Sequence, residues 1–418
     1  MIRRFKLLIS NNRLVIENFS FLSILQVINL IIFFLITPFL FRILGKTQYG
    51  LVVFAQNITT YFSILINYGF NATATRDISI NRENPKERSM IVSSTIVLKF
   101  LFFGFSLMLM TIFVMFIPFF KSHPLLFYFS MLYCLSEALF PIWYFQGIEK
   151  MKFITYINVV VRTISALSIF FIISDSSEYY LVPLVLGSGS LAGALIGLII
   201  VFFYYGNYFI LQNSGTLKRL ILINFPLFIS NVSSQIYVNA NKLFIGSFMG
   251  MQQLAIYDIA DRIVNLIKVP LSIIGQVLFP KVARDGNLNY IKKTMIISVS
   301  GYILIYLVLF AFTGILVHLI AGSYNQEIIL IVRILGLSVI PICAGLFYAD
   351  LRLLAFGFLK DYTRMRTASL FIYTLLLIIL YAFNYTGLNQ LAIVIIIVEL
   401  FVLIYSKYLC SIHKLTVS

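Results

Sequence analysis

The stretch AIYDIADRIVNLIKVPLSIIGQVLFP, residues 255–280, is long and apolar enough to cross a lipid bilayer, yet it contains Asp258, Asp261, Arg262 and Lys268. A helix needs roughly 20 mostly apolar residues to span the hydrocarbon core. An ionisable side chain is costly there and usually faces the interior of a helical bundle or a water-filled cavity. The stretch therefore predicts a membrane helix with one face that serves a function.

The composition of the whole chain predicts an all-α polytopic membrane protein. Of its 418 residues, 61% are hydrophobic and 11% are charged, and the mean hydropathy is +0.98. Soluble domains have about 25% charged residues. Long runs of Ile, Leu and Phe argue against a transmembrane β-barrel, whose strands alternate in polarity. Windows of spanning length predict about twelve transmembrane helices, at 14–41, 49–70, 91–117, 125–146, 154–174, 181–203, 222–247, 255–279, 295–320, 327–349, 368–386 and 388–406.

Lys and Arg predict the orientation, because basic residues gather in cytoplasmic loops. If both termini are cytoplasmic, only Arg42, Lys46 and Lys121 fall in outer loops. The net charge of +16 then reflects membrane topology, and no nucleic-acid partner is expected. The basic start leads into a full-length span, so no cleavable signal peptide is expected. The scattered Cys and His residues predict no disulfide framework, no metal site and no cofactor.

The two halves of the chain resemble each other around the loop that follows the first helix of each half. ILGKTQYGLVVFAQNI (43–58) aligns with FMGMQQLAIYDIADRI (248–263), which places Gly45 on Gly250. Parallel repeats of this kind occur in transporters that rock about a central site. We therefore expect two six-helix bundles around a central cavity, formed by residues 1–210 and residues 211–418.

Polar residues recur three or four positions apart on three of the predicted helices, so each of these helices has one polar face. Such faces either join helices by hydrogen bonds or line a hydrated cavity, and the charged members favour the cavity. The residues are Gln56, Thr60, Ser63 and Asn67 on the second helix, Asn231, Gln235, Asn239 and Lys242 on the seventh, and Asp258, Asp261, Asn265, Lys268, Ser272 and Gln276 on the eighth.

Bases outnumber acids within the predicted spans. Arg262 follows Asp258 by four residues, so these two can pair. The remaining positive charge suits an anionic head group such as a phosphate. In the alternative interpretation each base pairs with an acid or extends to the membrane surface. The bases are Lys99, Arg162, Lys242, Arg262 and Lys268, with Arg42 and Arg333 near the outer edge, and the acids are Glu17, Glu137, Asp258, Asp261 and Glu399.

Glu137 is the strongest candidate for coupling transport to an ion. It lies at mid-depth in the fourth predicted span, with no cation beside it in the sequence. A carboxylate in a medium of low dielectric can bind and release a proton as its surroundings change. An ion pair with a base on another helix is the alternative role for Glu137.

Further segments resemble the polysaccharide transport family of O-antigen (Wzx-type) flippases, within the multidrug/oligosaccharidyl-lipid/polysaccharide exporter superfamily. They are PIWYFQGIEKM (141–151), RILGKTQYG (42–50) and FNATATRDISINR (70–82). The resemblance extends over the full length, including the number of helices. In the first segment we expect structural roles. Pro141 should kink the helix, and Gly147 should let the chain leave the helix in a tight turn. Trp143 and Tyr144 should anchor the helix at the membrane interface.

The resemblance implies a flippase rather than an enzyme. It would move an oligosaccharide on undecaprenyl pyrophosphate from the cytoplasmic to the periplasmic leaflet of the bacterial inner membrane by alternating access. Implied partners are membrane lipids, a proton or sodium ion that drives transport, and a polysaccharide polymerase with its chain-length regulator. The diphosphate is expected to contact Lys99, Arg162, Lys242, Arg262 and Lys268. The sugars are expected to contact Gln56, Thr60, Asn67, Asn231, Asn239 and Asn265. The expected gating or coupling residues are Arg42, Arg76, Glu137, Asp258 and Asp261.

Three alternatives remain open at this stage. A multidrug or organic-cation antiporter would share the fold but favour an excess of acids. A peptidoglycan-precursor flippase typically has two additional helices. A membrane-embedded polysaccharide polymerase or acyltransferase would need clustered catalytic groups and often a long external loop, whereas the predicted outer loops are short. No nucleotide-binding motif is present, so direct use of ATP is not expected.

Overall fold

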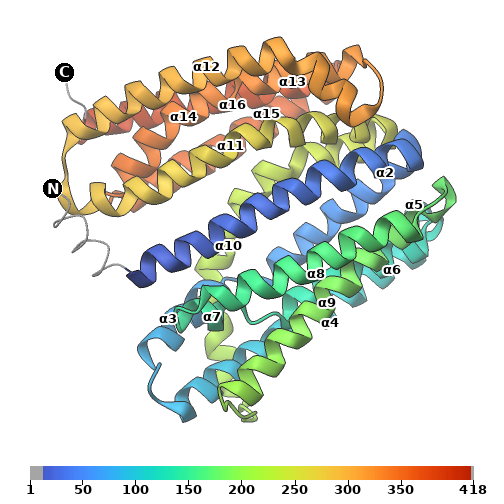
Figure 1. Cartoon of the computed structure of the whole chain (residues 1–418). Coiled ribbons are helices and arrows are strands. Elements are labelled where there is room, and N and C mark those ends of the chain that lie inside the picture. The colour runs from blue at the N-terminus through green and yellow to red at the C-terminus, as the bar shows by residue number, and fades with distance from the viewer. Residues whose placement is uncertain (1–12, 416–418) are drawn as a thin grey trace. The chain divides into compact units, whose positions relative to one another are not determined.

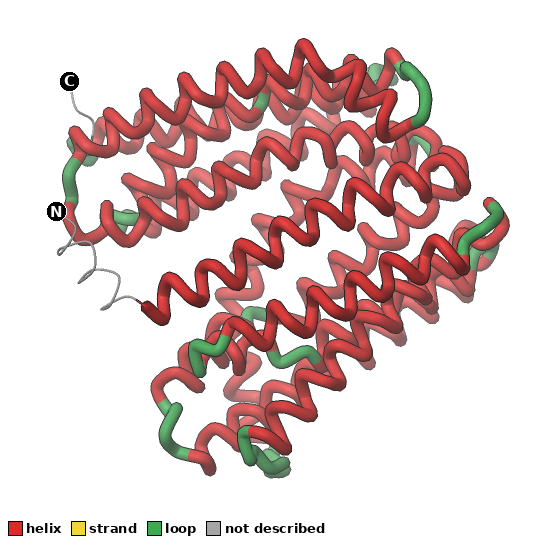
Figure 2. The backbone as a smooth tube through the Cα atoms, in the orientation of Figure 1, coloured by secondary structure: helices red, strands yellow, loops and turns green. Residues whose placement is uncertain are grey.

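The structure, a computed structural model, describes residues 13–415, and every regular element in that range is helical (Figure 2). The predicted all-α fold is therefore confirmed. By length and composition, nine candidate membrane spans lie in the described part of the chain, so the predicted number of twelve is not confirmed. Part of the difference is α2 (Arg13–Asn67), which joins the first two predicted spans in one element that is kinked at Gly45.

The chain forms two compact units, and the boundary between them lies inside α10 (Ser214–Phe248), after Gln235. The division predicted from the sequence, between residues 210 and 211, stays a prediction. Besides α2, the first unit holds α3 (Phe70–Ile80), α4 (Pro85–Phe116), α5 (Pro118–Lys121), α6 (Pro124–Leu139), α7 (Ile142–Gly147), α8 (Met151–Ile172), the short helix η1 (Ser176–Tyr180), α9 (Leu181–Ile199) and the π-helical turn η2 (Ile200–Tyr204).

Within the first unit, α6 lies against α2, α4 and α9, and α8 packs on α2 and α9 (Figure 1). The second unit contains α11 (Met251–Asp285), α12 (Leu288–Ala321), α13 (Gln326–Leu337), α14 (Val339–Tyr348), the π-helical turn η3 (Ala349–Leu354), α15 (Leu359–Ala382) and α16 (Leu388–Ile412). There α16 packs on α13, α14 and α15, while α11 packs on α13.

The aligned glycines of the two halves have the same unusual backbone conformation. Gly45 has φ 70° and ψ 172° inside α2, and Gly250 has φ 98° and ψ 166° immediately before α11. This region of backbone space is essentially reserved for glycine. The alanines that the same alignment pairs, Ala55 and Ala260, are both completely buried. The sequence repeat is therefore also a repeat of local structure.

Replacing Gly45 with alanine should destabilise the protein by about 1–3 kcal/mol, because a side chain makes this conformation strained. Gly104 in α4 is the matched control, since a Cβ at either glycine would meet no atom within 4 Å. Gly104→Ala should be neutral or stabilising, because alanine favours a helix by up to about 1 kcal/mol over glycine. Thermal unfolding of the purified variants measures both effects, and equal stability of the two would contradict the backbone explanation.

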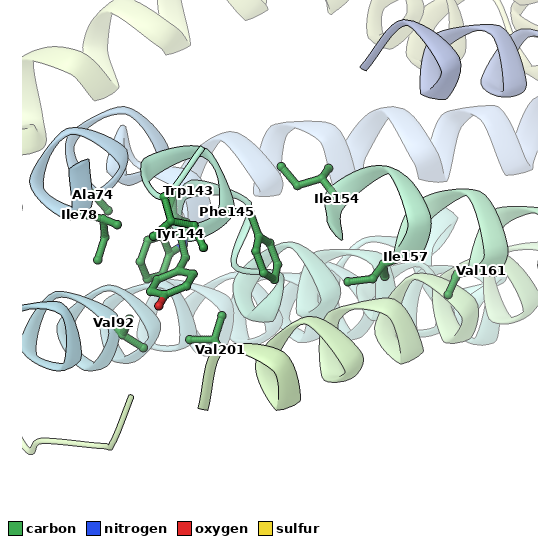
Figure 3. Close-up of a cluster of buried hydrophobic side chains, with 11 residues drawn as sticks. Ala74, Ile78, Val92, Trp143, Tyr144, Phe145, Ile154, Ile157, Val161 and Val201 are labelled. Carbon is green, nitrogen blue, oxygen red and sulfur yellow. The ribbon is translucent and has the colours of Figure 1, made fainter. Parts of the chain in front are cut away.

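The segment PIWYFQGIEKM forms a break in the helix, as predicted, but its aromatic residues have a different environment from the one predicted. α6 ends at Leu139, and the chain turns at Phe140 and Pro141 before α7 begins. Trp143 and Tyr144 are fully buried in a cluster with Phe145, Ile78 and Val201, as Figure 3 shows. The prediction that they are interfacial anchors is wrong, because neighbouring protein segments cover both rings.

Gly147 permits the close packing of α7 on α3. A Cβ at this position would lie 2.6 Å from Cγ2 of Ile78 and 2.9 Å from the carbonyl oxygen of Thr75. The hydroxyl of Thr75 donates a hydrogen bond of 3.2 Å to the carbonyl oxygen of Trp143. Arg82 donates a further hydrogen bond of 3.0 Å to the carbonyl oxygen of Gly147. α3 and α7 are therefore held together through both side-chain packing and hydrogen bonds.

Candidate functional site

A charge network within the second unit accounts for three of the four ionisable residues in the stretch 255–280. Lys242 of α10 lies 2.8 Å from Oδ1 of Asp258 and 2.9 Å from Oδ2 of Asp261. The guanidinium of Arg262 lies 2.5 Å from Oδ2 of Asp258, which confirms the pair predicted from their spacing. Two bases and two acids thus form a neutral group, and the carboxylate of Asp258 is only 1% exposed.

A second polar contact, not predicted from the sequence, lies beside this network. Asn241 donates a hydrogen bond of 3.0 Å to the hydroxyl of Tyr257, and the hydroxyl of Tyr373 donates one of 2.5 Å to Oδ1 of Asn241. All three residues are buried. They connect α10, α11 and α15, so this end of α10 is fixed by both ionic and neutral hydrogen bonds. The only signal in the sequence was the position of Asn241 next to Lys242.

Beyond this network, the described residues on the polar face of α11 are more exposed. Asn265 and Ser272 are exposed, and Lys268 is half-buried. Among the residues whose side chains are described, no acid forms an ion pair with Lys268. On α10, Asn231 is exposed and Asn239 is half-buried. The side chains of Gln235 and Gln276 lie outside the described residues.

The first unit contains a continuous chain of polar side chains from α4 to α6. Nζ of Lys99 donates a hydrogen bond of 3.3 Å to Oδ1 of Asn71, whose Nδ2 donates to Oδ1 of Asn67 at 3.2 Å. Nδ2 of Asn67 donates in turn to Oε2 of Glu137 at 3.2 Å. Lys99 is completely buried, and Glu137 is half-buried. We name these four residues the amide relay.

Arg162 extends the polar region from the amide relay toward α8. Tyr133, one turn before Glu137, lies within electrostatic range of both Glu137 and Arg162. Arg162 also donates a hydrogen bond of 2.7 Å to Oδ1 of Asn29. The exposed apolar residues of α8 form a stripe on its opposite side, Tyr156, Val160, Ile164, Leu167 and Phe171. Arg162 is therefore exposed on the side of α8 that faces α2.

The structure brings together some of the predicted site residues and separates others. Lys99, Asn67, Glu137 and Arg162 belong to one polar region of the first unit, and Lys242, Asp258, Asp261 and Arg262 belong to one charge network of the second. The hydroxyl of Thr60 donates 2.9 Å to the carbonyl oxygen of Gln56 in its own helix. Arg42 and Arg76 are exposed. Glu17 has a side chain outside the described residues.

Asn71, Tyr133 and Asn29 are site residues that the sequence prediction missed. Asn71 follows Asn67 by four residues and so continues the polar spacing of α2 across the break at Tyr68 and Gly69. That spacing was a usable signal for Asn71. Tyr133 and Asn29 had no such signal. Across the described range, no group of three or more His, Cys, Asp or Glu residues could hold a metal ion.

Asp258→Asn should destabilise the second unit by about 3–5 kcal/mol, because removing one member of a buried ion pair leaves the other charge uncompensated. Arg262→Met combined with Asp258→Asn should recover part of this loss. The exposed pair Arg82–Glu149, at 3.2 Å, provides a control. Glu149→Gln should change the unfolding free energy by no more than about 1 kcal/mol. Denaturation of the purified variants in detergent tests this, and similar effects at both sites would contradict it.

The fold of this chain is shared with membrane transporters of known structure. It superposes on lipid II flippase MurJ in an inward closed conformation with a TM-score of 0.71 and 15% identity, over 93% of this chain and 87% of that one. It also superposes on an inward-facing multidrug resistance MATE family transporter of the MOP superfamily, with a TM-score of 0.67 and 12% identity, over 94% and 96% of the chains. The helices and their order therefore define a multi-span membrane protein with the MOP transporter fold.

The family follows from the sequence itself. Residues 15–285 match the model of the polysaccharide biosynthesis protein family, and the chain belongs to this family. A curated relative from Escherichia coli (strain K12), named as a putative O-antigen transporter, is 24% identical over 284 residues, which is 68% of each chain. The resemblance inferred from the motifs is thereby confirmed.

Proposed function

We propose that this protein is a flippase that moves an oligosaccharide linked to undecaprenyl pyrophosphate from the cytoplasmic to the periplasmic leaflet of the bacterial inner membrane. Its family and the name of its E. coli relative support a polysaccharide-related transporter. The fold that it shares with a lipid II flippase is compatible with a lipid-linked substrate. Transport would proceed by alternating access of two bundles, residues 1–210 and 211–418, with both termini in the cytoplasm, and would be driven by an ion gradient.

The observation that carries the proposal is the excess of positive charge over acid in the polar region of the first unit. Among the described residues there, Lys99 is attracted by the carboxylate of Glu137, and Arg162, which lies within electrostatic range of Tyr133, hydrogen-bonds to the neutral Asn29. Cations and amides together match a sugar diphosphate, because phosphate oxygens accept charge-assisted hydrogen bonds and sugar hydroxyls bond to amides. Half-buried Lys268 and exposed Asn265 add the same chemistry on α11.

The proposal also assigns roles to the other site residues predicted from the sequence. Lys242 and Arg262 are paired with Asp258 and Asp261, so they would reach a diphosphate only in a state that releases them. Asp258 and Asp261 would then act in gating, together with Arg42 and Arg76. Sugar hydroxyls would meet Gln56, Thr60, Asn67, Asn231, Asn239 and Asn265.

Export of organic cations is the second candidate, because the same fold occurs in a multidrug resistance transporter. Deletion of the gene and complementation in its own host distinguishes the two. A flippase deletion should abolish the labelled surface polysaccharide and leave drug sensitivity unchanged, and the intact gene should restore the polysaccharide. Persistence of surface polysaccharide together with increased drug sensitivity would instead support the exporter.

Lys268→Ala should reduce polysaccharide export by about tenfold or more, because a charge-assisted hydrogen bond contributes about 1.5–3 kcal/mol and about 1.4 kcal/mol corresponds to a factor of ten. Lys268→Arg should retain most of the export, since it keeps the charge. Lys293→Ala, at an exposed lysine of α12, is the control for loss of a surface charge. Export is measured at equal protein levels, and unchanged export by Lys268→Ala would remove Lys268 from the pathway.

A further inference from the structure

We propose that Glu137 is a proton-binding site and that its protonation is transmitted through Asn67 and Asn71 to the buried Lys99, and from there to α3. The inference deepens the proposed function, on which it rests for the use of the proton as the driving ion. It is carried by the geometry of the amide relay, by the burial of Lys99, and by the backbone breaks around α3.

The hydrogen bonds of the amide relay all run in one direction. Lys99 can only donate, and a carboxylate can only accept, so the two ends determine the orientation of both amides between them. In the structure each asparagine accepts through its oxygen on the Lys99 side and donates through its nitrogen on the Glu137 side. A proton on Glu137 removes the charge that anchors the chain. The bond from Asn67 then changes from charge-assisted to neutral, which is roughly half as strong.

The groups around Glu137 favour a proton over a sodium ion. Asn67 presents its amide nitrogen to the carboxylate, at 3.2 Å from Oε2. Sodium ions in transporters are coordinated by backbone carbonyls and other oxygen atoms. A donor nitrogen cannot coordinate a sodium ion, which needs several oxygen ligands, whereas a proton needs only one oxygen of the carboxylate.

Protonation of Glu137 would leave Lys99 without its compensating charge. Lys99 is completely buried, and Glu137 is the acid that attracts it electrostatically. Among the described residues, Lys99 has no direct salt bridge, and its hydrogen bond goes to the neutral Asn71. An uncompensated buried charge is strongly unfavourable. This cost disfavours the present packing of α4 on α3 and favours an arrangement in which water or an anion reaches Lys99.

α3 is the element that can respond. It is short, and left-handed residues precede it, Tyr68 with φ 42° and Gly69 with φ 89°. Asn71, in its first turn, belongs to the amide relay, and its carbonyl oxygen accepts a hydrogen bond of 2.6 Å from Thr75. Thr75 also bonds to the carbonyl oxygen of Trp143 on α7. A shift of Asn71 is therefore passed by one turn of α3 to Trp143, the only tryptophan in the chain.

Several ionisable groups lie around Glu137, and the Glu137→Gln variant below distinguishes its protonation from theirs. α2 contributes the amide of Asn67, and α9, which packs along α6, has no ionisable residue. α5 and η1 pack near the start of α6, where His123 and Tyr179 bond to each other, far along the helix from Glu137. Among the described residues, the ionisable groups within electrostatic range of Glu137 are Lys99 from α4 and Tyr133 and Cys134 from α6 itself. Arg162 from α8 lies within range of Tyr133.

The test uses the fluorescence of Trp143 in the purified full chain, reconstituted in lipid nanodiscs without any lipid-linked sugar. The emission of the wild-type protein should follow a single-proton titration as the pH is lowered, and sodium chloride added at constant pH should not reproduce the change. Glu137→Gln keeps an acceptor for Asn67 and should lose the titration. Glu178→Gln, at an acid of η1 that lies outside the amide relay, should keep it.

Two further variants test transmission. Lys99→Met and Asn71→Ala should lose the Trp143 response, while the carboxyl band of Glu137 in infrared difference spectra still titrates. A wild-type response in Glu137→Gln, or in both transmission variants, would overturn the proposal, as would an equal response to sodium. If Glu137→Gln does not elute as folded protein, Glu137→Asp decides, because its titration must move to a different midpoint. A failed complementation would contradict the flippase but leave this result standing.

Discussion

A charge inside a membrane helix must be compensated by the protein, because lipid offers it neither water nor counter-ions. Asp258 shows how this chain meets the requirement: its buried carboxylate bonds to Lys242 of α10 on one oxygen and to Arg262 of its own helix on the other. The pairing compensates three of the four ionisable side chains in the stretch 255–280. It also ties α11 to α10 at the point where the chain has just entered the second unit.

The first unit meets the same requirement in a different way. Lys99 and Glu137 are not in direct contact, and two asparagine side chains connect them. A direct salt bridge would be a static neutral pair. Two amides in series instead separate the two charges while keeping them connected by hydrogen bonds. Arg162 adds a positive charge that forms no ion pair with a described acid, and its hydrogen bond goes to the neutral Asn29.

The two halves share backbone geometry more than side chains. Gly45 and Gly250 have nearly the same backbone conformation, although the helices that follow them differ in charge, with Gln56 in the place of Asp261 and Val53 in the place of Asp258. The turn is preserved because only glycine tolerates it. The polar faces differ because the charged residues of the first unit's polar region lie on α4, α6 and α8, whereas the charge network of the second unit lies on α10 and α11. This combination suits a transporter in which related bundles contribute different groups.

The sequence by itself determined the helical fold, the family, the pair Asp258–Arg262 and the polar faces of three helices. All of these depend on local periodicity and composition, which can be read along the chain. Only the tertiary structure decided which partner each charge has. It placed Lys242 on two acids, connected Lys99 to Glu137 through Asn71 and Asn67, and buried Trp143 and Tyr144 that the sequence predicted at the membrane surface. The reason is physical: a helix repeats every 3.6 residues, so spacing shows which residues share a face, but the neighbour of that face depends on how separate helices pack.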